Sequence, residues 1–246
     1  MSITKIFKES ISVAKGNPLI FIPMLAASVL SALLSLIFVG SAVPMAGRFS
    51  GEQIAANPEQ ALAGVGVAAG AMFIIGIIST FVGLLTHSMT VAMADTALKG
   101  ERATLQNGWS RIISRIVAVI IASVLMGVIV GAGFIMLVLP GIILAFFLMF
   151  TLVALIVDDL GAFKAIGQSF KTVGKNFGAT FITFLVIIGL AIITGIANFI
   201  VALIPLLGAV LSLIIYALFT GFITIFIVRV YSELSVQTDA SPEVEA

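Results

Sequence analysis

Long apolar runs constrain this sequence more than any other feature. Uncharged stretches of at least about 17 to 25 residues, the length of a helix that crosses a bilayer, recur along the chain. Hydrophobic residues make up 61% of the 246 residues and charged residues 9%, with a mean hydropathy of +1.29. Because soluble domains carry about 25% charged residues, this composition predicts an all-α, polytopic membrane protein. The chain has no cysteine, which excludes disulfides, thiol catalysis and thiolate metal sites.

Six segments are predicted to cross the membrane. They cover residues 19–40, 62–98, 116–138, 142–157, 177–203 and 209–230. The second is longer than a bilayer requires, so we expect its end to project into the cytoplasm. Uncharged turns at Leu139-Pro140-Gly141 and at residues 204–208 are predicted to join the third crossing to the fourth and the fifth to the sixth. Residues 1–231 are therefore interpreted as one membrane domain, and residues 232–246 as a disordered acidic cytoplasmic tail.

Three further segments have the pattern of amphipathic helices that lie in the membrane interface. They cover residues 2–15, a short piece around Leu105 and Trp109, and residues 162–176. Each carries apolar residues at helical spacing with lysine or arginine outside the apolar stripe, which is typical of interfacial helices. Each also precedes a pair of crossings. The sequence thus predicts a pseudo-threefold repeat, in which every unit is a cytoplasmic surface helix followed by a helical hairpin.

The basic residues indicate how the chain is oriented. Eleven of the twelve lysines and arginines fall on the side of the six crossings that holds both termini, and only Arg48 falls on the other. Cytoplasmic loops are the ones enriched in lysine and arginine, so both termini are predicted to be cytoplasmic. This orientation accounts for the basic residues without nucleic acid, and no nucleic-acid partner is predicted.

The basic surface helices are the first candidate functional feature. Their cations would face the anionic headgroups at the cytoplasmic face of the bilayer. Trp109 is the only tryptophan, and its indole suits a position at headgroup level. Contacts with lipid, with a membrane protein partner or with a second copy of the chain are expected from Lys164, Lys171, Lys175, Trp109 and Arg111.

Two adjacent aspartates, Asp158 and Asp159, precede the third surface helix. A cation or a lipid amine would be a suitable ligand for them. Helix capping is the favoured interpretation, because aspartate accepts hydrogen bonds from the free N–H groups of a helix N-terminus and suits the positive end of the dipole.

A candidate polar seam follows the last hairpin. Its members are Asn198, Ser212, Tyr216, Thr220 and Thr224, with His87 on the second crossing. Asn198 and Ser212 lie seven residues on either side of Pro205, so we expect them at similar depth and bonded to each other. The seam would line a pathway or a lipid-headgroup groove, or it would serve helix packing through hydrogen bonds of about 0.6 kcal/mol. Packing is the favoured interpretation, also for His87.

Catalytic patterns are missing from the sequence. It contains no nucleophile–base pair, no His-Glu-x-x-His, no phosphate-binding glycine loop and no paired carboxylates within a crossing. The sequence therefore predicts a protein that is not an enzyme, with no catalytic residues, cofactor or metal.

Residues 137–177 resemble a known family. The pattern is the Pro140-Gly141 turn, a crossing, the acidic pair Asp158-Asp159, and an alanine-containing helix with the step Ser169-Phe170. It is similar to the membrane domain associated with glycerophosphodiester phosphodiesterases and to related uncharacterised six-helix membrane proteins of bacteria and archaea. Phe170 departs from that pattern, which has tryptophan there. The resemblance implies the six-helix fold and the cell membrane of a bacterium or an archaeon. It implies no activity, because the phosphodiesterase chemistry belongs to a separate soluble domain.

Two hypotheses of function follow. The first is a non-enzymatic membrane protein that acts on membrane lipid or on a membrane partner, in membrane homeostasis or as a scaffold. The alternative is a transporter, channel or permease subunit with the polar seam between its helices. The lack of acidic residues assigned to the interior of the crossings argues against coupling to protons or sodium.

Overall fold

The computed structural model describes residues 2–46, 58–205 and 207–240. Helices make up 89% of it, and the described residues contain no strand. Six segments are long and apolar enough to cross a membrane, which confirms the predicted all-α fold of a multi-pass membrane protein. These candidate spans are Pro18–Ile37, Met72–Leu98, Ile116–Met136, Val138–Val157, Phe177–Ala202 and Leu207–Thr238.

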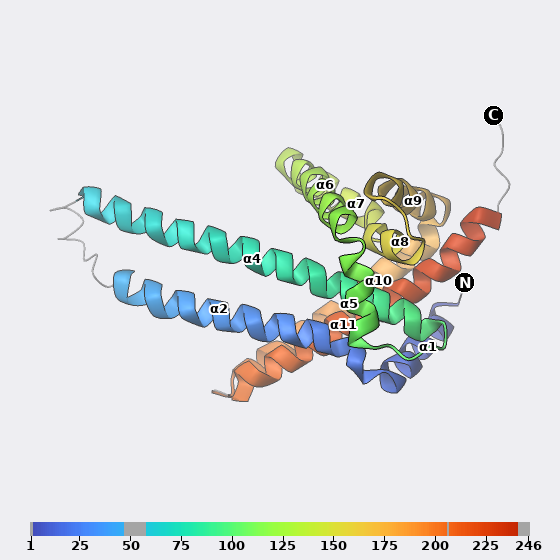
Figure 1. Cartoon of the computed structure of the whole chain (residues 1–246), viewed down its shortest axis with the longest axis horizontal. Helices are drawn as coiled ribbons and strands as arrows, with labels where there is room; N and C mark the ends of the chain where they lie inside the picture. Colours follow the sequence, from blue (N-terminus) through green and yellow to red (C-terminus); the bar gives the residue numbers. More distant parts are fainter. Residues whose placement is uncertain (1, 47–57, 206, 241–246) are drawn as a thin grey trace. The chain divides into compact units, whose positions relative to one another are not determined.

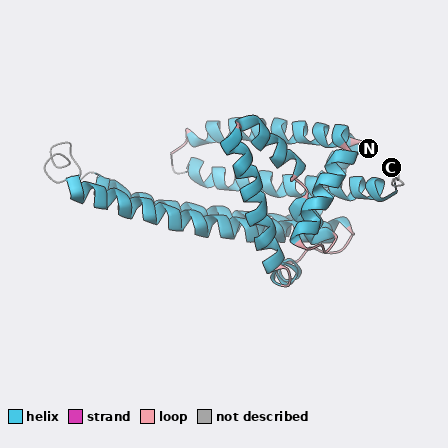
Figure 2. Cartoon of the chain, turned by 90° about the horizontal axis from the view of Figure 1, so that it is seen from above, coloured by secondary structure: helices cyan, strands magenta, loops and turns pink. Residues whose placement is uncertain are grey.

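Figure 1 labels the helices in chain order. They are α1 (Ile3–Gly16), the 3-10 turn η1 (Pro18–Phe21), α2 (Ile22–Ala46), α4 (Pro58–Leu98), α5 (Leu105–Ile113), α6 (Ile116–Met136), α7 (Val138–Phe147), α8 (Thr151–Val157), α9 (Ala162–Lys175), α10 (Phe177–Ala202) and α11 (Leu207–Ala240). Figure 2 shows the described part of the chain as helices with short loops. The short helices α1, α5 and α9 each precede two crossings, in the predicted order; the pseudo-threefold symmetry and the interfacial position of these helices stay predictions.

The chain divides into two compact units. One unit, Ala26–Gly83, holds most of α2 and the first part of α4. The other unit comprises Met1–Leu25 and Leu84–Ala246, and it contains the remaining helices. All the contacts described below lie within this larger unit.

The chain reverses between α6 and α7 at Leu137, and not at the predicted turn. Leu137 has an extended backbone (φ −169°, ψ 155°), and Leu139-Pro140-Gly141 lies in the first turn of α7. Proline is tolerated there, because the first N–H groups of a helix have no intrahelical partner. Gly141 serves close packing: a Cβ at this position would lie 2.6 Å from the ring of Phe134. A Cβ on Gly133 would lie 2.9 Å from the Cα of Gly141, so the two glycines let α6 and α7 touch.

The fourth crossing is interrupted between α7 and α8. At the break the Thr151 N–H donates to the Leu148 carbonyl at 3.0 Å, three residues back instead of four. Ser169 of α9 bridges the break: its hydroxyl donates to the Phe147 carbonyl at 2.7 Å and accepts from the Phe150 N–H at 3.2 Å. Ser169 and Phe150 are fully buried. A side chain of α9 thus completes the backbone hydrogen bonding of a crossing, as buried backbone groups require.

The last helix is longer than predicted. We expected the sixth crossing to end at residue 230 and a disordered tail to begin at residue 232, but α11 continues to Ala240. Packing explains the continuation, because Leu234 and Thr238 are buried and the Asn176 Nδ2 donates to the Thr238 hydroxyl at 2.8 Å. The remainder of the expected tail lies outside the described residues.

Helix α1 packs on α11. Ile6 and Ser10 are its buried residues, and Phe7 meets Phe222 and Phe226 edge to face at centroid separations of 5.3 and 6.0 Å. The apolar stripe from which we predicted an interfacial helix therefore contacts protein at these positions. This docking places the polar side of α1 next to the ends of α4 and α11, where the charged residues gather.

Candidate functional site

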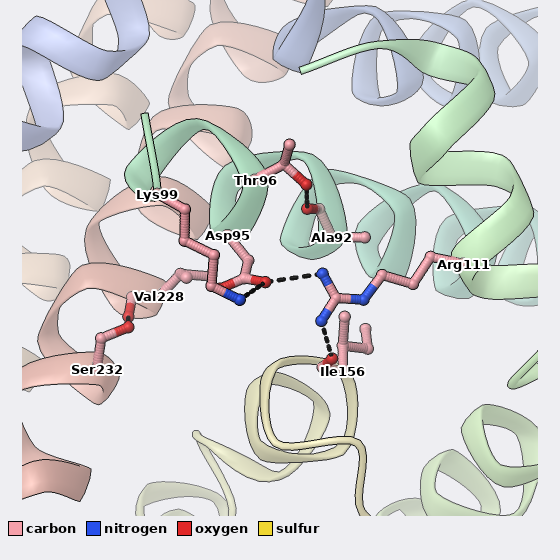
Figure 3. Close-up of polar contacts among 8 residues, drawn as sticks. All are labelled: Ala92, Asp95, Thr96, Lys99, Arg111, Ile156, Val228 and Ser232. Carbon is pink, nitrogen blue, oxygen red and sulfur yellow. Dashed lines mark hydrogen bonds and ion pairs between the residues drawn. The ribbon is translucent and has the colours of Figure 1, made fainter. Parts of the chain in front are cut away.

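A buried carboxylate lies near the end of α4. The side chain of Asp95 is 3% exposed and accepts from the Lys99 Nζ at 2.8 Å and from the Arg111 Nη1 at 2.7 Å. Arg111 also donates through its Nη2 to the Ile156 carbonyl at 2.8 Å, as Figure 3 shows. Lys99 directly follows the last residue of α4, and its N–H donates to the Asp95 carbonyl at 3.1 Å, so the two side chains lie on the same side of the chain, four positions apart. A buried charge must be paired and hydrogen-bonded, and this pairing joins α4, α5 and α8.

A second charge network joins α1 to α11. The Arg229 Nε donates to the Glu9 Oε2 at 2.8 Å, and the Arg229 Nη2 lies 3.5 Å from the Glu233 carboxylate. The exposed Lys5 approaches Glu9 at 3.9 Å, where solvent and salt screen its charge. Two carboxylates therefore share Arg229 here, with the exposed Lys5 as a further cation, whereas two cations share one carboxylate around Asp95. The network around Arg229 is balanced in charge, and the network around Asp95 has an excess of positive charge.

A pocket of about 550 Å³ lies between the two networks. Its polar lining comes from α1 (Glu9, Ser12), from Asp95 of α4 and Lys99 directly after it, and from α11 (Arg229, Ser232, Ser235). Its apolar lining comes from Val13, Leu98 and Val157. The volume falls within the range of roughly 300–1,000 Å³ that is usual for small-molecule sites. Charges of both signs, hydroxyls and apolar side chains are thus combined in one site.

The two adjacent aspartates do not cap α9, so the favoured interpretation was wrong. The residue at the N-cap is Gly161, and the cap has no side-chain hydrogen bond. Asp158 instead accepts from the Tyr231 hydroxyl of α11, and Asp159 pairs with Arg115. Asp159 has φ +58°, in the left-handed region that aspartate adopts more readily than most residues. The chain therefore turns at this pair after α8, and the two carboxylates bind the turn to Tyr231 of α11 and to Arg115, which directly precedes α6.

Three of the predicted lipid contacts lie on exposed surfaces. Lys164 and Lys171 are exposed on α9, and Trp109 is exposed on α5. Phe163, which sequence reasoning did not select, is 75% exposed beside Lys164. The combination of an exposed ring and exposed ammonium groups makes this side of α9 the candidate lipid surface.

Two of the predicted lipid contacts are bonded within the protein. Arg111 is held by Asp95 and by the Ile156 carbonyl, as described above. Lys175 is exposed, but its Nζ donates to the Thr238 carbonyl at 3.3 Å. Both residues therefore hold helices together in this structure.

The predicted polar seam is bonded largely within its own helices. The Asn198 Nδ2 donates to the Thr194 carbonyl at 3.1 Å, and the hydroxyls of Thr220 and Thr224 each donate to the carbonyl four residues back at 2.8 Å. Asn198 and Ser212, both described, form no hydrogen bond with each other, so that expected pairing was wrong. Such intrahelical bonds satisfy a hydroxyl without any neighbouring helix.

The structure does bring two seam residues together. His87 and Thr224 line one small cavity of about 90 Å³, with apolar residues from α4, α6, the α7–α8 break, α8 and α11 around them. Tyr216 is exposed and Ser212 is half-buried, and neither lines this cavity. Of the predicted seam, only His87 and Thr224 therefore line a common cavity.

Sequence reasoning missed Asp95, Glu9 and Arg229 as members of a site. A signal was present for Asp95, which is the only acidic residue between positions 60 and 100 and lies four residues before Lys99. Asp95 is buried within the protein, and the expectation that this end of α4 projects beyond the membrane stays a prediction.

Comparison with known proteins gives a family and no activity. A family model described as a domain of unknown function (DUF7847) matches residues 1–234, a range that includes both charge networks. Neither the curated proteins nor the solved structures gave a match. The resemblance to the membrane domain associated with glycerophosphodiester phosphodiesterases stays a prediction.

Proposed function

The chain belongs to the DUF7847 family, whose function is unknown, and we propose that it is a non-enzymatic membrane protein that acts on membrane lipid or on a membrane partner. It would reside in the cell membrane of a bacterium or an archaeon with both termini in the cytoplasm. Helices α1, α5 and α9 would then lie at the cytoplasmic face, where anionic headgroups attract basic side chains.

The outward face of α9 is the observation that supports this proposal. Phe163 and Phe170 are seven residues apart, which places them two turns apart on the same side of the helix, and Lys164 and Lys171 follow them directly. All four side chains are exposed, while the small residues of α9 form its buried face. Exposed rings beside ammonium groups suit the boundary between headgroups and acyl chains.

We expect a double variant of α9, Lys164→Gln with Lys171→Gln, to retain several-fold less anionic lipid than the wild type. Each lysine near an anionic surface contributes about 1 kcal/mol of attraction, so two should be clearly measurable. The experiment is purification from native membranes in mild detergent, with identification and quantification of the lipids and proteins that remain bound.

The matched control for this experiment is Lys164→Arg with Lys171→Arg, which keeps both positive charges at the same exposed positions on α9. The control should retain lipid and partners as the wild type does. Equal lipid content, equal partners and equal phenotype in the two double variants would remove the basis of the proposal.

The alternative is a transporter, channel or permease subunit, and the cavity beside His87 and Thr224 is the observation that supports it. Under our proposal, Tyr216→Cys and Thr220→Cys should both resist membrane-impermeant thiol reagents applied from either side. The chain has no other cysteine, so labelling is specific. Ser12→Cys, exposed at the open pocket, should react and is the control. Labelling of Tyr216→Cys or Thr220→Cys at the rate of this control would favour the transporter.

A further inference from the structure

We propose that the 550 Å³ pocket between α1, α4 and α11 binds a zwitterionic group that carries a phosphate and a primary ammonium, as the headgroup of an aminophospholipid does. The inference rests on the proposed action on membrane lipid and names the headgroup. It is carried by the members of both charge networks that line the pocket.

The wall formed by α4 has an excess of positive charge. Asp95 is already paired with Arg111 at 2.7 Å, so Lys99 is not required to neutralise it. The Lys99 side chain is 56% exposed and lines the pocket. A flexible ammonium of this kind suits a phosphate as a point charge. The phosphate of the ligand is therefore assigned to the Lys99 side.

The side formed by α1 and α11 offers a carboxylate to a ligand. Arg229 is shared by Glu9 and Glu233, and the other cation near Glu9 is Lys5, which is exposed and 3.9 Å away. Glu9 lines the pocket and is partly exposed. The ammonium of the ligand is assigned to this side. A zwitterion pairs with Lys99 and with Glu9 at once, whereas a ligand of one charge would pair with only one of them.

The hydroxyls favour an ammonium that still has N–H groups. Ser232 and Ser235 line the pocket, and their hydroxyls donate to carbonyls of α11 at 2.9 and 3.4 Å. A hydroxyl that donates in this way keeps lone pairs with which to accept. A primary ammonium offers three donors to these oxygens and to Glu9, but a choline group has no N–H to donate. The pocket should therefore distinguish ethanolamine from choline headgroups.

The apolar lining favours a lipid over a free phosphorylated amine. Val13, Leu98 and Val157 share the pocket with the charged side chains. The glycerol and the first acyl carbons of a lipid would cover these residues, whereas a small hydrated zwitterion would leave them uncovered. Lipid and free compound share the headgroup chemistry, and the experiment separates them.

The test measures binding of short-chain phosphatidylethanolamine, phosphatidylcholine and phosphatidylglycerol to the purified full-length protein by native mass spectrometry. We expect the ethanolamine lipid to bind at least about tenfold more tightly than the other two. Lys99→Gln and Glu9→Gln should each abolish this preference. Lys15→Gln, which removes an exposed charge of α1 outside the pocket, should leave it unchanged. Soluble phosphoethanolamine binding as tightly as the lipid would assign the same chemistry to a free compound.

A further variant shows whether a loss of the lipid preference is caused by misfolding. Ser12→Phe places a ring at an exposed position in the pocket without touching either charge network, and it should also abolish the preference while the protein unfolds at the wild-type temperature. An equal affinity for the ethanolamine and choline lipids, or a preference that persists in all three pocket variants, would overturn the inference. If the α9 double variant still loses anionic lipid in that case, the proposed function stands and only the headgroup assignment falls.

Discussion

Replacing Asp95 with alanine is expected to lower the free energy of unfolding by about 3 kcal/mol. The change removes two charge-assisted hydrogen bonds, and such bonds contribute about 1.5–3 kcal/mol each. The side chain of Arg111 is 33% exposed and would keep only the Ile156 carbonyl as a partner, so a partly buried cation would lose its counter-ion. The exposed ammonium of Lys99 is readily hydrated when the carboxylate is removed. The expected loss of unfolding free energy therefore lies at the lower end of the range for two such hydrogen bonds.

The measurement is denaturant or thermal unfolding in detergent. Asp95→Asn should show a smaller loss, because an amide oxygen still accepts one hydrogen bond but carries no charge. Glu101→Gln is the control, since Glu101 is an exposed acid just beyond the end of α4, and its replacement should change the free energy of unfolding by less than about 0.5 kcal/mol. If Asp95→Ala were as stable as the wild type, the network would not hold α4, α5 and α8 together.

Replacing Gly208 with alanine is expected to destabilise the hairpin of α10 and α11 by about 3 kcal/mol. A Cβ on Gly208 would lie 2.2 Å from the carbonyl oxygen of Val201. Because this neighbour is backbone, it cannot rotate away, and the two helices would have to separate at their connection. Overpacking of this kind typically costs 1–3 kcal/mol, and a clash with backbone belongs at the upper limit.

Gly195→Ala provides the matched control for this second prediction. Gly195 lies in the same α10, and a Cβ there would meet nothing within 4 Å. Alanine is favoured over glycine inside a helix by about 1 kcal/mol, so this variant should be as stable as the wild type or slightly more stable. Equal melting temperatures for Gly208→Ala and Gly195→Ala in the same detergent would contradict the expected clash.

The crossings could be predicted because a hydrophobic run determines that a helix spans the membrane and roughly where it ends. The surface segment predicted at residues 162–176 became α9, Ala162–Lys175, and the long second crossing does continue to Leu98. The Pro140-Gly141 turn was misplaced because proline suits the first turn of a helix as well as a β-turn. The last helix was predicted too short, because its polar end is held by long-range contacts of Thr238.

The charge networks could not be predicted in the same way. Hydrophobicity gives the depth of a residue along a crossing, but it does not give the rotation of the helix or its neighbours. Glu9 and Arg229 meet across 220 positions of sequence, and Asp158 meets Tyr231 across 73. Asp158 accepts from the distant Tyr231 in place of forming the helix cap that its local sequence favours. Only the pairs four residues apart, Asp95 with Lys99, Lys5 with Glu9 and Arg229 with Glu233, were visible in the sequence.

The hydroxyl of Ser169 also determines what it would take to move α9. Undocking α9 would remove the hydroxyl that bonds the Phe147 carbonyl and the N–H of the fully buried Phe150. A backbone group without a partner costs several kcal/mol where water cannot reach it. The stacked rings of Phe147 and Phe170, 5.3 Å apart, would separate as well. Helix α9 is therefore held to the fourth crossing at the point where that helix is interrupted.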